Sequence, residues 1–315
     1  MPDHPPDPRH RADNLDWSQP QPSNGAIYHG AGLTVRAYTA EELRARLSLP
    51  IPPGPAFPAT TTAPTTPASA APLTDVDKTR AGASARAEYR RRRAAELAGW
   101  AVRLPWRVAL VGAAALAGQL VASHTGLLDP WLAALAAAAG AAWRLRFRAS
   151  QPTRAWADGA RGERATARRL RRLERQGYVV LHDLQVPGSR ANVDHLAIGP
   201  AGVFVIDSKY YRGTLQLGVD GMLWYAGYPL AQQLATAVWA TLRVVEALQL
   251  SPEVPVVPLL VIHRAPVPWG GLTVAGVQVI PPNALGEVLG REAVLPAAQV
   301  GLLAGQATAR LHPAG

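Results

Sequence analysis

The stretch Gly199-Pro-Ala-Gly-Val-Phe-Val-Ile-Asp-Ser-Lys209, preceded by Asn192-Val-Asp-His195, is the most informative part of the chain. Its apolar run predicts a buried strand that ends in Asp-x-Lys, and its Gly-Pro-Ala-Gly segment predicts a tight turn. Because side chains alternate along a strand, Asp207 and Lys209 point to the same face. An apolar strand rarely carries two charges on one face without a reason, so this strand end is a candidate site.

Asp194, on the strand before the turn, adds a second carboxylate to this candidate site. Two carboxylates and a lysine at a strand end suit phosphodiester hydrolysis with a divalent metal ion, because carboxylate oxygens are ligands that Mg²⁺ and Mn²⁺ prefer. The plainer alternative is a surface salt bridge between Asp207 and Lys209. His195 falls on the opposite strand face from Asp194, so we expect it to pack or form a hydrogen bond rather than bind a ligand.

Residues 156–315 predict a mixed α/β domain. Helices are expected over 159–176, over 230–250 and from about residue 296 onward. Strands are expected over 178–186, 191–198, 203–209, 256–262 and 277–280, with a short pair over 213–219 and 223–225. The order of a helix, antiparallel strands, a helix and a further strand predicts a mixed sheet.

The ordered motifs resemble the nuclease-related domain, NERD, a branch of the PD-(D/E)xK restriction-endonuclease-like superfamily. The resemblance covers roughly residues 160–260, and the ordered set is more specific than Asp-x-Lys alone. The matching pieces are Gly162-Glu163, the segment 177–184, Asn192-Val-Asp-His195, the strand 199–209, the strand from Gly213 and the helix start at 229–233.

The resemblance implies a restriction-endonuclease-like αβββαβ core with a divalent-metal site. Asp194 and Asp207 would bind Mg²⁺ or Mn²⁺, and Lys209 would be the catalytic lysine. Glu163, on the first helix, would complete the site as a metal ligand or catalytic group. Its plainer role is a favourable interaction with the helix dipole. No other cofactor is implied.

Further contacts are expected from the helices on either side of the motif. The resemblance implies a catalytic helix glutamine, either Gln232 or Gln233, and the sequence leaves that choice open. Arg168 and Arg172 of the first helix, with Tyr211 after the motif lysine, are candidates for contacts with nucleic acid, DNA rather than RNA. The arginines fit a solvated helix face equally well, and Tyr211 also fits strand packing.

The net charge of +10 is concentrated upstream of this domain. Residues 79–155 carry a net charge of +9, compared with −2 for residues 1–78 and +3 for residues 156–315. Because the basic segment is also the most apolar, the charge indicates membrane topology before it indicates nucleic-acid binding. Residues 79–103 are therefore expected to form a basic juxtamembrane helix.

Two apolar runs, Val108–Ala122 and Trp131–Trp143, predict a two-helix transmembrane hairpin within residues 104–148. Arginines flank the outer end of each run, whereas the connector Ser123–Asp129 contains neither Lys nor Arg. The positive-inside rule then places both termini, and the nuclease-related domain, in the cytoplasm of a bacterial cell. The alternative is a soluble or interfacial pair of alanine-rich helices.

Residues 1–78 are rich in Pro, Thr and Ala, a composition that predicts disorder. One island, Leu33–Leu49, predicts a short helix with Thr39 as its N-cap. The absence of cysteine excludes disulfides, thiolate chemistry and cysteine-ligated metal sites.

The sequence as a whole predicts a membrane-tethered, Mg²⁺-dependent nuclease or nucleic-acid-processing protein that hydrolyses phosphodiester bonds. One alternative is a catalytically inactive nuclease-fold module that binds nucleic acid or protein, since a net charge of +3 on residues 156–315 is modest for a general DNA binder. A second is a membrane scaffold whose N-terminal tail recruits partners.

Overall fold

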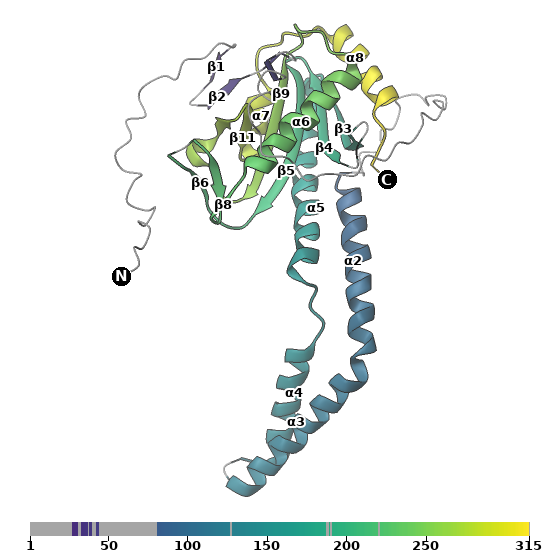
Figure 1. The fold of residues 1–315 in the computed structure, drawn as a ribbon, viewed down its shortest axis with the longest axis vertical. Coiled ribbons are helices and arrows are strands. Elements are labelled where there is room, and N and C mark those ends of the chain that lie inside the picture. The colour runs from purple at the N-terminus through teal and green to yellow at the C-terminus, as the bar shows by residue number, and fades with distance from the viewer. Residues whose placement is uncertain are drawn as a thin grey trace, which may run out of the picture. The chain divides into compact units, whose positions relative to one another are not determined.

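The computed structural model describes residues 27–30, 33–36, 38–39, 42–43, 81–126, 128–186, 189, 191–219 and 221–314. The chain divides into two compact units, which can be followed by colour in Figure 1. One unit comprises residues 84–160, and the other combines residues before 84 with residues after 160. Most of the segment 1–78, for which disorder is predicted, lies outside the described residues.

A six-stranded sheet organises the discontinuous unit. Its strand order is β10 (Leu272–Val274), β11 (Val277–Ile280), β9 (Val256–Arg264), β5 (Gly202–Tyr211), β4 (Asn192–Gly199), β3 (Val179–Gln185). The pairs β3–β4, β4–β5 and β10–β11 are antiparallel, whereas β5–β9 and β9–β11 are parallel. The prediction of an α/β domain with a mixed sheet is confirmed.

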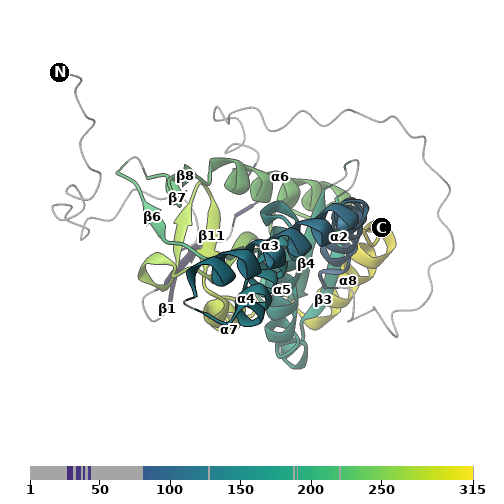
Figure 2. The ribbon, with the colours of Figure 1, turned by 90° about the horizontal axis from the view of Figure 1, so that it is seen from below.

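Helices cover both faces of this sheet, and Figure 2 shows α6 and α7 on opposite sides of the strands. One face packs against α6 (Ala231–Leu248) and α8 (Ala297–Arg310). The other packs against α7 (Leu285–Leu289), the 3₁₀ turn η3 (Leu173–Gln176) and the end of α5 (Gln151–Leu170). Val203 and Val205 of β5 belong to the first core, and Phe204 and Ile206 to the second, as strand alternation requires.

The β4–β5 hairpin has the tight turn that the sequence predicts. Gly199 pairs with Gly202 across the two-residue turn Pro200–Ala201. Gly202 has a φ of 125°, and a Cβ there would lie 2.6 Å from the Pro255 carbonyl oxygen. Because only glycine adopts this backbone conformation without strain, Gly202 fixes the turn and therefore the register of β4 against β5.

Between β5 and α6 the chain forms a small three-stranded sheet. Its strands are β6 (Leu215–Leu217), β7 (Leu223–Tyr225) and β8 (Tyr228–Pro229). The first two match the predicted short strand pair. Along the chain, the main elements of the domain therefore come in the order α5, β3, β4, β5, this three-stranded insertion, α6 and β9.

The described N-terminal residues differ from the sequence-based expectation. Residues Leu33–Arg36 form strand β2, which pairs antiparallel with β1 (Ile27–Gly30), so the predicted helix over 33–49 is wrong at its start. The predicted cap is confirmed, because Thr39 Oγ1 accepts a hydrogen bond from the Glu42 N–H at 3.2 Å. Pairing with the neighbouring strand β1 overrides the helix propensity of this segment.

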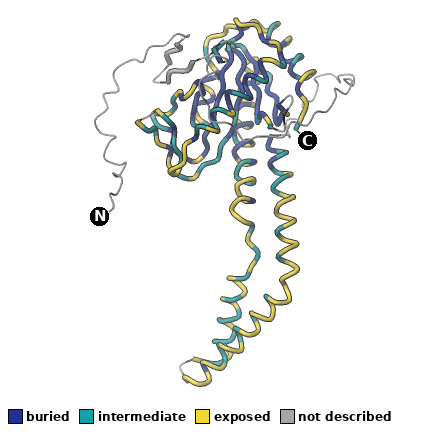
Figure 3. Tube along the Cα trace, in the orientation of Figure 1, coloured by how far each residue is buried: buried dark blue, intermediate teal, exposed yellow. Residues whose placement is uncertain are grey.

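The helical unit contains α2 (Ala83–Val102, which begins at its boundary), α3 (Leu104–Thr125) and α4 (Pro130–Leu145). Among the described residues, α3 is the one helix long and apolar enough to cross a membrane, judged by length and composition. Helices α3 and α4 pack closely at Gly118, where a Cβ would lie 2.8 Å from the Ala133 carbonyl oxygen. Most of their remaining surface is exposed, and Figure 3 shows it in yellow and teal.

Arginine and tryptophan side chains gather where α3 begins and α4 ends. Leu145 O accepts hydrogen bonds from Trp100 Nε1 and from the Arg107 guanidinium. Two further guanidiniums, those of Arg146 and Arg148, lie 4.7 and 5.0 Å from the centre of the Trp143 ring. Basic groups stacked on indole rings are typical of the interface between hydrocarbon and water.

Candidate functional site

The candidate site lies where β4 and β5 diverge. Their pairing ends at His195 and Ile206, although β4 stays paired with β3 and β5 stays paired with β9. Asp194, which precedes His195 on β4, accepts a hydrogen bond from the Ser208 N–H at 2.7 Å. A carboxylate therefore occupies the gap that the diverging strands open, and it satisfies a backbone donor that has lost its strand partner.

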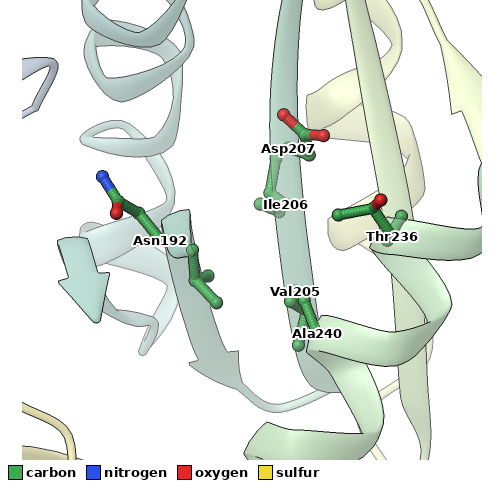
Figure 4. A pocket seen from close by; sticks show the side chains of 8 residues that line it. Asn192, Val205, Ile206, Asp207, Thr236 and Ala240 are labelled. Carbon is green, nitrogen blue, oxygen red and sulfur yellow. The ribbon is translucent and has the colours of Figure 1, made fainter. Parts of the chain in front are cut away.

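Asp207 and Lys209 lie on the α6 face of β5, as strand alternation predicts. Lys209 Nζ donates to Asp207 Oδ1 at 2.7 Å, and the two side chains are 32% and 23% exposed. Asp207 also lines a small pocket against α6, and Figure 4 shows Thr236 on the side of Asp207 and Ala240 beside Val205. The salt bridge that was the plainer alternative is present, and it forms within the candidate site.

Glu163 approaches the site from α5 and is 7% exposed. The preceding Gly162 faces the His263 ring and Tyr210, which lie 3.4 and 3.6 Å from where a Cβ would be, within ordinary van der Waals contact. The backbone of Gly82 donates a hydrogen bond to the Glu163 side chain. The Gly-Glu pair of the motif thus places a carboxyl group against the sheet.

The acidic groups are close enough to perturb one another. Burial, then the charges of Asp183 and Asp207, raise the pKa of Glu163 to about 7. Burial and the same kind of repulsion, from Glu163 and Asp207, raise the pKa of Asp194 well above its usual value. Burial lowers the pKa of Lys209, but Asp207 and Asp194 outweigh it and hold that pKa above its usual value.

Asp183 is an acidic neighbour of the site that the sequence motifs do not single out. It is 2% exposed and lies on β3 between the pairs His182–His195 and Leu184–Val193, opposite Asp194. Its φ is 53°, in the left-handed region that Asp tolerates better than most residues. Its Oδ1 accepts from Asn192 Nδ2 at 3.1 Å. The signal in the sequence is a lone acid inside an apolar strand.

The α5 face of the sheet carries a separate set of polar residues. The Nδ1 atoms of His182 and His195 lie 2.8 Å apart, and both rings are buried, so the expectation that His195 is packed or hydrogen-bonded is confirmed. Ser208 Oγ donates to Thr166 Oγ1 at 2.8 Å, and that oxygen is 2.8 Å from His263 Nε2. Burial lowers the pKa of His182 and of His263 to about 4, so both are neutral.

The two candidate glutamines at the start of α6 differ in environment. Gln232 is exposed. Gln233 is half-buried, its Oε1 has no hydrogen-bond partner among the described residues, and it lies on the helix face of Ala237 and Ala240, which line the pocket beside Asp207. Gln233, and not Gln232, therefore lies on the packed side of α6.

The residues considered for nucleic-acid contacts do not form one surface. Arg168 and Arg172 are exposed on the α5 side of the sheet. Tyr211 packs on the α6 side, where its ring stacks on Tyr225 at 4.1 Å between centroids. One face of the Tyr211 ring is therefore already covered by protein.

The donor chemistry of the acidic cluster fits a hard divalent cation, because the candidate ligands are carboxylate oxygens. A cation would also relieve the repulsion that raises the pKa values of Glu163 and Asp194. Within the described ranges, however, no three His, Cys, Asp or Glu side chains are already gathered at metal-binding distances. The carboxylate of Asp207 is instead paired with Lys209.

The fold and the cluster define a mixed α/β domain with acids and a lysine at diverging central strands. Residues 158–263 match the family model of the nuclease-related domain, NERD, so the family indicated by the sequence motifs is confirmed for this segment. The chain is also 33% identical to an uncharacterized protein of Bacillus anthracis over 72 residues, which are 22% of this chain and 34% of that protein. It thus spans about a third of that relative's length. No solved structure matches the chain.

Proposed function

We propose that the unit containing residues 158–263 is a divalent-metal-dependent nuclease that hydrolyses phosphodiester bonds. The observation that carries the proposal is the meeting of Asp194, Asp207 and Lys209 where β4 and β5 diverge. The NERD match supports a nuclease-related function for the same residues. The order α5, β3, β4, β5, α6 and β9 supports a restriction-endonuclease-like αβββαβ core.

Asp194 and Asp207 would hold Mg²⁺ or Mn²⁺, with Glu163 as the third carboxylate. When bound, such an ion supplies Lewis-acid stabilisation of phosphate oxygens and a water ligand of lowered pKa. Lys209 stays protonated at neutral pH, because the two aspartates hold its pKa above its usual value. It therefore acts as a positive partner for a phosphate oxygen rather than as a base.

Glu163 and Gln233 would complete the site from the flanking helices. Because the pKa of Glu163 is about 7, this carboxyl takes up a proton near neutral pH and so reduces the repulsion with Asp183 and Asp207. Gln233 Oε1, for which the described residues supply no hydrogen-bond partner, would accept a hydrogen bond from a water or a substrate hydroxyl group.

DNA is the substrate that we propose ahead of RNA. Arg168, near the end of α5, and Arg172, just before η3, would contact backbone phosphates outside the acidic cluster. Tyr211, which is held by Tyr225, would form part of the wall beside Lys209 rather than a free stacking platform.

We also propose that residues 104–148 tether this nuclease to a bacterial cell membrane, with both termini in the cytoplasm. The length and apolar composition of α3 support a membrane span. The arginines at the outer ends of α3 and α4, and the connector without Lys or Arg, support the orientation.

The test uses the full chain in detergent or nanodiscs, mixed with supercoiled plasmid and Mg²⁺ or Mn²⁺. Asp194→Asn and Asp207→Asn keep the shape of the side chain but remove its charge. We expect both variants to lose nicking together with Mn²⁺ binding measured by titration calorimetry. Glu246→Gln is the matched control, because Glu246 is an exposed acid of α6 in the same unit and pairs only with its helix neighbour Arg243 in the salt bridges described.

Nicking by Asp207→Asn at the rate of the unchanged chain would refute the proposal. Single-stranded DNA and RNA of the same length, tested in parallel, decide the substrate class. Faster cleavage of RNA would overturn the preference for DNA and leave the metal site in place.

A second candidate function is a catalytically inactive module that binds nucleic acid. The observation that favours it is the closed Asp207–Lys209 ion pair, together with the absence of a gathered ligand set among the described residues. It predicts DNA binding without Mn²⁺ binding and without cleavage in the unchanged chain.

A further inference from the structure

Residues from both sides of the helical unit build one core. Tyr38 and Val256 form a two-way bridge, with N–H to carbonyl distances of 3.0 and 3.2 Å. Tyr38 and Leu43 are 2% and 0% exposed and belong to the same hydrophobic core as α6 and β9. A segment far upstream of α3 is therefore a structural part of the domain that resumes after α4.

The sequence specifies the local shape of this upstream segment. The Thr39 N–H donates to Glu42 Oε2 at 2.9 Å, while Thr39 Oγ1 accepts from the Glu42 N–H at 3.2 Å. Such a reciprocal capping box fixes the first turn of a helix. Here it fixes the turn that carries Leu43, so the docked residue is presented by a defined local structure.

A second upstream contact lies immediately before α2. Ala81 is 3% exposed, and the backbone of Gly82 donates to the Glu163 side chain at the candidate site. The residues just before the helical unit thus pack on the same domain as the residues just after it.

These contacts constrain how the chain passes a membrane. A bilayer cannot run through a paired backbone bridge and a shared hydrophobic core, because the separated polar groups and apolar surfaces would lose their partners. A single crossing by α3 would place residues 38–43 and 161–314 on opposite sides. We infer that the chain crosses the bilayer twice, through α3 and then α4, so that residues 38–43 and 161–314 lie on the same side. This inference rests on the membrane tether proposed above, but it is independent of the distribution of charge.

Helix α4 is a suitable second crossing although it is short. Its 16 residues span about 24 Å, compared with a hydrocarbon core of about 30 Å. Its contact with Gly118 of α3 brings the two backbones together, which is how helices associate in lipid. Leu132 and Leu135 are each 67% exposed, so apolar surface remains for lipid contact. Arg146 and Arg148 can extend beyond Trp143 to reach water at the helix end.

Cysteine labelling tests the topology directly, because the chain contains no cysteine of its own. Three variants each introduce one thiol at an exposed position. The new thiol lies before α3 in Ala94→Cys, at the end of α3 in Thr125→Cys and after α4 in Ser251→Cys. Intact cells producing each variant are treated with a membrane-impermeant maleimide, and the same reaction is repeated after lysis. We expect Thr125→Cys to react in intact cells and the other two variants to react only after lysis.

Reaction of Ala94→Cys and Ser251→Cys from opposite sides would overturn the inference. So would protection of Thr125→Cys in intact cells, since neither helix would then cross. An alkaline carbonate wash distinguishes a wrong topology from the absence of a tether. If the wash releases the protein from membranes, the tether itself is refuted. Neither result alters the plasmid assay, which tests the nuclease separately.

The docking of the upstream segment has its own test. Leu43→Ala removes a fully buried side chain, whereas Leu302→Ala, the matched control on α8, removes one that is 60% exposed. We expect Leu43→Ala to lower the urea concentration at the midpoint of unfolding of the full chain, and Leu302→Ala to leave it unchanged. Equal midpoints for both variants would show that the upstream segment does not belong to the core.

Discussion

The two faces of β5 treat their polar residues in opposite ways. On the α6 face, Asp207 and Lys209 remain partly exposed and pair with each other. On the α5 face, Ser208 is 4% exposed and continues a chain of hydrogen bonds through Thr166 to His263. Residues that alternate along one strand therefore belong to two different environments.

The two faces of β5 therefore differ in role: one carries polar groups that stabilise the fold, and the other carries polar groups that can bind a ligand. The Ser208 and Thr166 hydroxyl groups and the His263 ring are joined by hydrogen bonds inside the core. The carboxyl groups of Glu163, from α5, and of Asp194, from β4, crowd with Asp207 instead, and burial together with that crowding raises the pKa values of Glu163 and Asp194. Such crowding of carboxyl groups is a mark of functional sites, because the fold accepts unfavourable repulsion there.

Lys209→Met is the change with the largest expected effect on the α6 face. It removes the only cationic group described as hydrogen-bonded to Asp207 while keeping the length of the side chain. We expect cleavage to fall by about 100-fold or more, as when a preorganised charge partner is lost. The partly exposed ion pair should contribute no more than about 1 kcal/mol to stability. Plasmid nicking and urea unfolding of the full chain measure the two effects. A large loss of stability would contradict this expectation, because it would give Lys209 a structural role like that of Ser208 on the opposite face.

Glu163→Gln should raise stability while lowering cleavage. The pKa of Glu163 is raised to about 7 from 4.5, so its protonation favours the folded state below pH 4.5 and this stabilisation is lost as the pH rises through 7. At pH 8 the glutamine should therefore increase the free energy of unfolding by up to about 3 kcal/mol. At pH 4.5 it should change little. Urea unfolding at both pH values measures the difference, and equal effects at the two would contradict the assigned pKa.

Local rules were sufficient to predict much of this arrangement from the sequence. Alternation along an apolar strand placed Asp207 and Lys209 on one face, and the Gly-Pro-Ala-Gly segment predicted the turn that sets the register. These features depend on neighbours in the chain, whose geometry is nearly fixed by residue type.

Features that depend on distant partners could not be predicted in the same way. The bridge between Tyr38 and Val256 joins segments on either side of the helical unit, and no local pattern announces it. Asp183 has a left-handed backbone, and its place beside the acidic cluster depends on the register of β3 with β4. The half-buried position of Gln233 and the exposed position of Gln232 likewise depend on how α6 packs.

Thr166→Val tests the opposite face of β5. The substitution keeps the shape of a fully buried side chain and removes the oxygen shared by Ser208 and His263. We expect the free energy of unfolding to fall by about 2 kcal/mol, the typical cost of leaving buried polar groups without a partner. The cleavage rate per folded molecule should not change. Thr308→Val is the control, since the Thr308 hydroxyl donates only within its own helix, to Ala304 O, among the contacts described.

The smallest effect is expected from the double variant Arg168→Gln and Arg172→Gln. Both guanidiniums are exposed on the α5 side, away from the face that carries Asp207 and Lys209. If they contact backbone phosphates, their loss should weaken DNA binding by about tenfold or less and reduce its dependence on salt concentration. Cleavage at saturating DNA should be unchanged, because neither group lies in the acidic cluster. Binding isotherms at several salt concentrations, with single-turnover cleavage alongside, measure both quantities. A fall in the saturated rate would mean that the two faces of the sheet act together on the substrate, so that the α5 face would not be purely structural.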